Sequence, residues 1–391
     1  MTDRSRLYLV IFLSTLLNTA FMGCRVGVPL LAIELEASTM TVGVLMSLFG
    51  LLPMLLSVHA GRWIDAVGAG IPMIVSAGAM ALALLLAFVQ PELWVLFPLA
   101  AVTGLAFIAF NLAATAIVGG LGGPEDRTAN FSWLSVAGGI SNFAGAVITG
   151  HMIDAIGHAP AFAVLALLPA LVAAVIVMVR YAHPSRPRAP RRASGQKVLE
   201  LLHQPGLLPL LIIAGAIGMS WDLYNFMIPV YGSAIGLSAG SIGNVMGAFG
   251  LSVLLVRVLL PMLARLMGEW RMVLAAIYLS AAVFVAFPFG NAPAVLMVLS
   301  FLFGIAFGAA QPIITALLFN ASPSGREGEV MGVRMTLHNA VHASTPALFG
   351  VLSGILGLLP LFLGIGALLA GVGWISKVRW SKDWSRLRTR K

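Results

Sequence analysis

The chain has 391 residues, of which 60% are hydrophobic and only 9% are charged. An ordinary soluble domain is roughly 25% charged, so 23 Lys and Arg and 14 Asp and Glu residues are too few to cover a globule of this length. Composition therefore excludes a soluble enzyme, a disordered chain and a fibrous protein. It indicates an all-α polytopic membrane protein, because a β-barrel would show short alternating segments instead.

Twelve apolar runs follow one another along the chain, each long enough to cross a bilayer, which takes about 20 residues. In the first half we expect membrane-spanning helices at 7–33, 40–64, 70–90, 93–119, 129–155 and 158–181. In the second half we expect them at 205–234, 239–264, 271–290, 293–319, 326–354 and 357–377.

A hydrophilic stretch rich in Pro and Arg separates the two sets of six spans. We therefore expect an N-terminal six-helix bundle over 1–181, a basic linker over 182–204, a C-terminal six-helix bundle over 205–377 and a basic tail over 378–391. The net charge is +9, but the basic residues lie in short clusters between apolar runs. Such clusters are typical of loops beside anionic lipid headgroups, and we expect no nucleic acid partner.

Lys and Arg are confined to one side of the predicted membrane. If the N-terminus starts in the cytoplasm, the loops on the opposite side carry only acidic charges, at Glu34, Glu36, Glu92 and Asp154. The positive-inside rule then predicts that both termini are cytoplasmic, in a membrane that we take to be a bacterial inner membrane. The single cysteine, Cys24, excludes an intrachain disulfide, and the first run lacks a signal-peptide cleavage site.

The two halves resemble each other when 200 is added to the residue number. Matching pairs are Pro29 and Pro229, Ser38 and Ser238, Gly43 and Gly243, Gly104 and Gly304, Gly150 and Gly350, and Gly157 and Gly357. Because each half holds an even number of spans, the copies enter the membrane in the same orientation. This predicts a parallel repeat, with two bundles related by a pseudo-twofold axis along the membrane normal and a site at their interface.

The loop after the second span carries a motif. Residues 61–70 read GRWIDAVGAG, and together with the two six-helix halves and the basic linker they resemble the major facilitator superfamily of secondary transporters. That family's motif in this loop is G-x-x-x-D-R-x-G-R-R/K, of which Gly61, Asp65 and Gly68 match, whereas its basic positions are not basic here.

The resemblance implies a conformational latch. Asp65 would meet the N-terminus of the eleventh helix near Arg326, where the helix dipole favours an anion, and would hold the cytoplasmic side shut. In the second half, Arg265 stands where the repeat places the counterpart of Asp65. It would face Glu125 and Asp126, or simply mark the membrane boundary.

Ionisable and amide side chains at membrane depth are candidates for a binding site, because they are costly in lipid and usually face a bundle interior. Arg25 lies deep in the first span, and Asp222 lies in the seventh. Arg334, His338 and His342 are four residues apart on the eleventh, so they share one helix face. The remaining candidates are Asn18, Asn111, Asn142, Asn225 and Gln311, with Trp221, Tyr224 and Phe226 as stacking surface.

These residues predict a charge preference. Counting Arg257 of the eighth span, three arginines and two histidines face one aspartate, which favours a small organic anion or zwitterion. Proton coupling needs a group that changes charge, and Asp222 is the first candidate, ahead of His338 and His342. Other interpretations stay open: Asp222 could merely neutralise Arg25 as a buried ion pair, and Arg257 could reach the membrane interface.

The sequence thus predicts a proton-coupled secondary transporter that works by alternating access. The alternative is a proton-driven exporter of hydrophobic drugs or metabolites. The drug-antiporter branch of the family carries an arginine in its fourth helix and Gly-Pro in its fifth, and both are missing from 99–118 and 138–145. No Walker motif is present, so an ATP-driven pump would need a separate subunit. No loop is long enough to hold a soluble catalytic domain, so we expect neither an enzyme nor a cofactor or metal. The expected partners are a small solute, protons and the bilayer, and the expected state is a monomer.

Overall fold

Helices make up the computed structural model, which describes residues 3–122, 126–179, 206–322 and 326–380. The first six are α1 (Asp3–Glu34), α2 (Thr39–Val67), α3 (Gly70–Val89), α4 (Leu93–Gly120), α5 (Arg127–Ile156) and α6 (His158–Met178). The second six are α7 (Leu207–Ala234), α8 (Ala239–Met267), α9 (Glu269–Ala286), α10 (Pro293–Ala321), α11 (Glu327–Leu356) and α12 (Leu358–Ile375). The twelve predicted spans correspond to these helices, while the predicted linker over 182–204 lies outside the described residues.

Helix α9 ends earlier than predicted, and α11 is less apolar than the other helices. The ninth span was predicted to run to residue 290, but α9 ends at Ala286 and a short 3₁₀ turn, Phe287–Phe289, follows it, because Pro288 cannot continue the α-helical hydrogen bonding. Eleven of the twelve helices are long and apolar enough to cross a membrane, and α11 is the exception in the described chain. The lower hydropathy of α11 follows from the polar candidates that it carries.

The repeat is visible in the helix boundaries. The first residues of α2 and α8 are 200 residues apart in the chain, and so are their last residues. The same holds for α5 and α11. The caps also agree: the Ser38 hydroxyl accepts a hydrogen bond from the Thr41 backbone N–H, and the Ser238 hydroxyl accepts one from Ser241, each at 3.2 Å. Equivalent residues therefore build equivalent structure in the two halves.

The cap on α8 also shows that Ser238 is not the nucleophile of a hydrolase. Residues 236–240 read GLSAG, which has the G-x-S-x-G spacing of a hydrolase nucleophile elbow. An elbow serine stands between a strand and a helix. Ser238 instead lies between two helices, and its hydroxyl caps the second of them.

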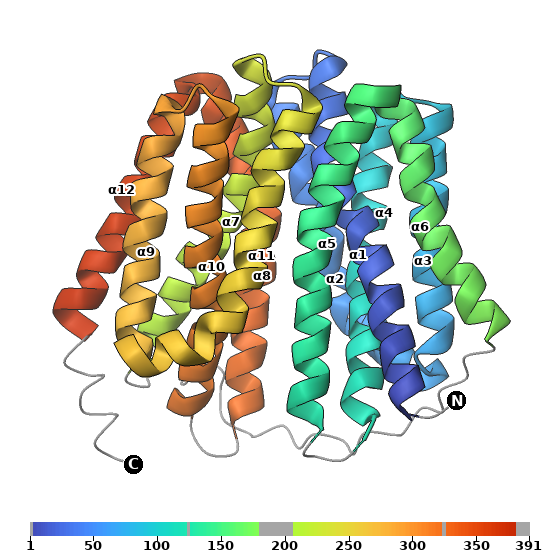
Figure 1. Cartoon of the computed structure of the whole chain (residues 1–391), viewed down its shortest axis with the longest axis horizontal. Coiled ribbons are helices and arrows are strands. Elements are labelled where there is room, and N and C mark those ends of the chain that lie inside the picture. Colours follow the sequence, from blue (N-terminus) through green and yellow to red (C-terminus); the bar gives the residue numbers. More distant parts are fainter. Residues whose placement is uncertain (1–2, 123–125, 180–205, 323–325, 381–391) are drawn as a thin grey trace.

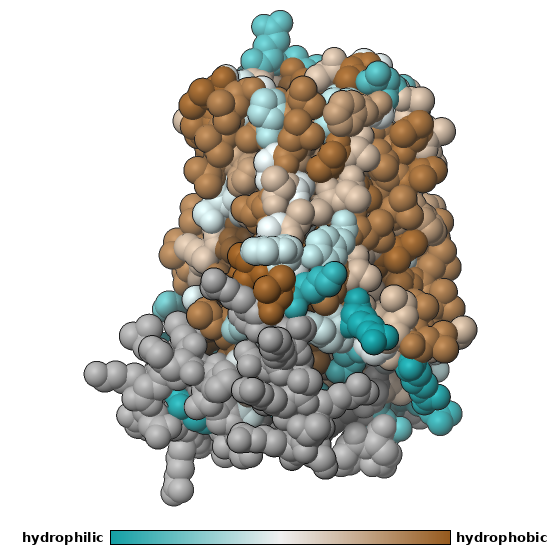
Figure 2. Space-filling view, turned by 90° about the vertical axis from the view of Figure 1, so that its left-hand side faces the viewer, coloured by the Kyte–Doolittle hydropathy of each residue, from teal (hydrophilic) through white to brown (hydrophobic). Residues whose placement is uncertain are grey.

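The helices form two lobes that stand side by side (Figure 1). Contacts within the N lobe join α1 with α4, α5 and α6, and α3 with α4 and α6; the equivalent contacts build the C lobe from α7–α12. The starts of α1 and α7 and the end of α12 lie on one side, which we call the terminal side, and the opposite side is the distal side (Figure 1). Apolar side chains cover the lateral surface in the view of Figure 2, as lipid contact requires.

The lobes touch on the distal side through two symmetric helix pairs, α2 with α11 and α5 with α8. A methyl group on Gly43 would lie 2.7 Å from the Cα of Gly350, and one on Gly150 would lie 3.0 Å from the Cα of Gly243. The two pairs are exchanged by the repeat. Since only glycine lets two helix backbones come this close, these four residues close the distal side, and we call them the distal gate.

Toward the terminal side the close contacts between α2 and α11 end. Gly50 is the last glycine of α2 that packs against α11, and a methyl group added to it would lie 3.0 Å from the backbone nitrogen of Ala343. Nearer the terminal side of the same two helices, a methyl group added to Gly61 or Gly332 would have no neighbouring atom within 4 Å. The described conformation is therefore closed at the distal side, and α2 and α11 are parted toward the terminal side, while α5 and α8 still touch at Gly139 and Leu254.

Glycines also set the packing inside each lobe, which yields a prediction. A methyl group added to Gly104 would lie 2.8 Å from the Cα of Phe49, and one added to its repeat mate Gly304 would lie 3.1 Å from the Cα of Phe249. We expect Gly104→Leu and Gly304→Leu each to destabilise the protein by about 1–3 kcal/mol through overpacking, measured as a lower Tm in detergent. Gly78→Leu is the control, because nothing lies within 4 Å there; equal Tm values for all three would contradict the prediction.

Candidate functional site

A buried charged triad joins the two lobes near the middle of the membrane. Arg25 of α1 lies with one guanidinium nitrogen, Nη2, 3.6 Å from Oδ1 of Asp222 on α7, and both side chains are almost fully buried. Its Nη1 lies 3.4 Å from Nε2 of His342 on α11, and His342 Nδ1 contacts the same Asp222 oxygen. One cation of the N lobe is thus held by two titratable groups of the C lobe.

The two contacts of His342 match one tautomer of its ring. Arginine only donates hydrogen bonds, so Nε2 of His342 must accept from Arg25 and carries no proton. Nδ1 then carries the proton and donates it to the Asp222 carboxylate. Both contacts are thus satisfied by the His342 tautomer that carries its proton on Nδ1.

The triad is incompletely hydrogen-bonded. The Nε of Arg25 and the Oδ2 of Asp222 are buried without a hydrogen-bond partner among the described residues. Aromatic faces surround the guanidinium instead, with its carbon 4.5 Å from the Trp221 ring centre and 5.9 Å from that of Phe49. Asp222 Oδ2 therefore keeps an unused acceptor position.

A half-exposed row of side chains lies beside the triad in the C lobe. Trp221 stacks between Phe307 and His342, at 5.9 and 5.8 Å between ring centres. Trp221 is partly exposed, and its helix α7 contacts α1 and α2 of the N lobe as well as helices of its own lobe. His342 stacks in turn on His338 at 6.1 Å, which continues the row toward the terminal side.

Arg334 ends this row. Its Nη2 donates to Oε1 of Gln311 on α10 at 2.9 Å, and both side chains are half-buried. The three α11 candidates therefore lie on one face, as their spacing predicts. Arg257 of α8 donates to the backbone oxygen of Ser135 at 3.4 Å and also crosses between the lobes.

Apart from Arg25, the N lobe contributes amides to this region. Asn18 and Asn111 bond to each other reciprocally, at 2.9 Å from Asn111 Nδ2 and 3.5 Å from Asn18 Nδ2. The repeat mate of Asn18 is Gly218, and His338 lies against it, with Nδ1 3.5 Å from the position of an added methyl group. The missing side chain in the C lobe thus makes room for a histidine.

The other predicted residues are placed less centrally. Asn142 and Asn225 line a small hollow between the lobes, each donating to the backbone of its own helix. Tyr224 is buried in the C-lobe core, where its ring packs on Phe249 at 4.9 Å, and Phe226 is fully buried. A binding role for these four residues stays a prediction.

The predicted latch is not engaged in this conformation. Asp65 and Arg265 are exposed, and Gly68 ends α2. Arg326, the predicted neighbour of Asp65, bonds Glu329 of its own helix at 2.6 Å. A latch that holds the terminal side shut belongs to a conformation with that side closed, so it stays a prediction, and Glu125 lies outside the described residues.

Sequence reasoning missed a contact at the distal gate. Asp154, which it treated as a boundary charge, accepts a hydrogen bond from the Gly240 backbone N–H at 2.9 Å. This places a carboxylate of the N lobe at the N-terminus of α8 in the C lobe, where the helix dipole stabilises it. One turn before it, His151 bonds Asn244 at 3.0 Å. The repeat gave no signal for this contact, because the mate of Asp154 is Gly354.

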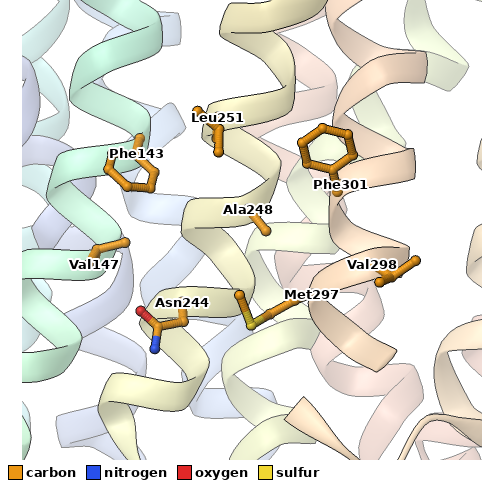
Figure 3. A pocket seen from close by; sticks show the side chains of 8 residues that line it. All are labelled: Phe143, Val147, Asn244, Ala248, Leu251, Met297, Val298 and Phe301. Carbon is orange, nitrogen blue, oxygen red and sulfur yellow. The ribbon is translucent and has the colours of Figure 1, made fainter. Parts of the chain in front are cut away.

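A separate groove lies among α5, α8 and α10 (Figure 3). Phe143 and Val147 of α5 form one wall, and side chains of α8 and α10 form the rest, with Asn244 at one end (Figure 3). Its volume is about 320 Å³ and its lining is almost wholly apolar. It contains none of the predicted site residues.

Comparisons with known proteins agree with this architecture. A sequence model of the Major Facilitator Superfamily matches residues 7–346. The chain is 25% identical over 356 residues to the multidrug resistance protein MdtG of Dickeya zeae (strain Ech586), covering 87% of this chain and 85% of that protein.

Solved structures share the fold at low sequence identity. A POT family transporter in complex with a thioalcohol-conjugated peptide superposes with a TM-score of 0.80 at 15% identity, covering 97% of this chain and 96% of that one. The nucleoside transporter NupG superposes with a TM-score of 0.74 at 14% identity, covering 94% of this chain and 97% of that one. Together with the family match over most of its length, this makes the chain an integral membrane transporter, not an enzyme, and a member of the Major Facilitator Superfamily.

Proposed function

We propose that the protein is a proton-coupled secondary transporter that moves a small organic anion or zwitterion by alternating access. The observation that carries this proposal is the triad, in which Arg25 of one lobe is held by Asp222 and His342 of the other. A change of charge on either partner changes a contact between the lobes. Protonation and lobe movement are therefore linked at one place.

The chemistry of the link follows from the hydrogen bonds. A proton on Asp222 removes the negative charge that holds Arg25. A proton on His342 places an Nε2–H against the N–H of Arg25, where two donors face each other. Each event weakens the buried contact between the lobes, and the loss of that proton restores it.

The solute would bind on the parted side of the triad. Arg334 and His338 face this space from α11, and Trp221 and Phe307 add stacking surface. The planar arginine fork suits a carboxylate or phosphate. Lys and Arg lie on the terminal side, so we place that side in the cytoplasm of a bacterial inner membrane, with the described conformation open inward.

A second candidate is proton-driven export of hydrophobic compounds. The observation that favours it is the relative MdtG, which is named a multidrug resistance protein. The two functions differ in the charge of the solute, because a lipophilic cation gains nothing from arginines that lack an acidic partner.

Proteoliposomes with a trapped pH-sensitive dye test the proposal. With an imposed pH gradient, we expect organic anions or zwitterions to cross together with protons, and an ionophore that collapses the gradient to stop their accumulation. Export of a cationic dye, with organic anions and zwitterions never competing, would favour the second candidate. If the gradient drives no solute in either direction, both transport proposals are wrong.

A further inference from the structure

The acidic groups available to a solute are few. Among the described residues, Asp222 is the single acidic side chain in the middle of a membrane-spanning helix. It is fully buried, and its Oδ1 already receives Arg25 and His342. Its other oxygen, Oδ2, has no hydrogen-bond partner among the described residues but is buried, so an ammonium group on the solute does not reach this carboxylate in the described conformation.

The basic groups, in contrast, are left without acidic partners. Arg334 bonds only the neutral Gln311, and Arg257 bonds only a backbone oxygen, among the described residues. Arginine keeps its charge at any physiological pH, and an uncompensated charge at membrane depth is costly. A bound anion would offset that cost at Arg334 and Arg257, whereas a bound cation would add to it.

The orientation of Arg334 makes it suitable for an anion. Nη2 of Arg334 donates one hydrogen bond to Gln311. This contact fixes the plane of the guanidinium and leaves its other N–H groups for a ligand. His338 stands one turn along the same face, so it can donate to the same anionic group. Close by, Trp221 and Phe307 stack with 17° between their ring planes, which offers a flat apolar wall.

Resting on the transport function proposed above, we propose that the solute is an organic anion with an apolar, ring-containing body and no ammonium group. Its carboxylate or phosphate binds Arg334 beside His338, and its body lies toward Trp221 and Phe307. Arg257 supplies a second positive charge. Zwitterions and cations are poor ligands because the single carboxylate at this depth is buried and already pairs with Arg25.

A matched set of probes on one skeleton tests this. 3-Phenylpropanoate is an anion, phenylalanine is the zwitterion with an added ammonium, and 2-phenylethylamine is the cation. Equivalent sets on an indole and on a cyclohexyl skeleton remove dependence on one ring. Affinities are measured by calorimetry on the full chain in nanodiscs, and proton-coupled uptake is measured in proteoliposomes.

We expect each anion to bind at least about tenfold more tightly than its zwitterion, as an interaction with a charged group implies. Arg334→Gln should remove most of this preference, Arg334→Lys should keep part of it, and the exposed Arg271→Gln should keep all of it. Phenyl phosphate separates the two anion types: tighter binding than phenylpropanoate would assign a phosphate.

Several results would overturn the inference. Zwitterions that bind as tightly as anions, amines that bind more tightly, or a panel in which no probe binds would each contradict it. Proton-coupled uptake of phenylalanine would refute the anion assignment while leaving the transport function intact. Loss of anion binding in Arg271→Gln as well would show a general effect of charge and not a site at Arg334. The Tm of every variant is recorded, and if Arg334→Gln fails to fold, Arg334→Lys alone must still raise the Kd of the anion.

Discussion

Asp222→Asn is expected to abolish proton-coupled transport and to destabilise the protein. The substitution keeps the size of the side chain but removes the charge that holds Arg25, which is buried beside it at 3.6 Å. Removing one partner of a buried ion pair costs about 3–5 kcal/mol, because the other charge is left uncompensated. The measurements are solute uptake driven by a pH jump in proteoliposomes and the Tm in detergent.

A double variant separates the two effects. Arg25→Met with Asp222→Leu removes both charges, and replacing a buried pair by apolar residues is often neutral for stability. We expect the double variant to regain most of the lost Tm but none of the coupling. Asp154→Asn, at the lobe junction but outside the triad, should keep proton coupling. Full coupling in Asp222→Asn would remove Asp222 from this role, and an unchanged Tm would show that the ion pair is not stabilising.

Much of the fold could be predicted because hydropathy and punctuation are local properties of a chain. The second span was expected at 40–64 and α2 runs from Thr39 to Val67. The eleventh span was expected at 326–354 from its apolar run, and α11 covers it although α11 is the one described helix whose hydropathy falls short. The internal repeat added long-range information, since it predicted that the two halves enter the membrane in the same orientation. Pattern and repeat together were sufficient for the two-lobe arrangement.

The candidate site was predictable only as a set of polar residues. That Arg25, Asp222 and His342 meet depends on which helices of the two lobes are neighbours, and no spacing along the chain encodes it. Arg25 was expected to face a solute, but it lies in the ion pair that sequence reasoning kept as an alternative. The conformation could not be predicted from the sequence either, because the same chain carries Asp65, in the predicted latch on one side, and Gly150, in the closed contact on the other.

Gly150→Leu is expected to prevent closure of the distal side and to stop transport. A methyl group at this position would already lie 3.0 Å from the Cα of Gly243 and 3.1 Å from the carbonyl carbon of Ala239. Backbone cannot yield as a flexible side chain can, so the strain is relieved only when α5 and α8 separate. If overpacking costs the closed state about 1–3 kcal/mol, the equilibrium shifts roughly 5- to 150-fold toward the state open on the distal side.

Spin labels report this shift directly. Ile156 and Leu356 are exposed repeat mates at the distal ends of α5 and α11, one in each lobe, and both can be labelled as cysteines after Cys24→Ala removes the native thiol. Gly150→Leu should move the distance distribution between the labels to longer values. Gly138→Leu, on the same helix with nothing within 4 Å, should leave it unchanged. An unaltered distribution and normal uptake in Gly150→Leu would mean that the glycine contacts are incidental to closure. A longer distance with lost uptake would instead tie the transport cycle to four glycines that the internal repeat exchanges in pairs.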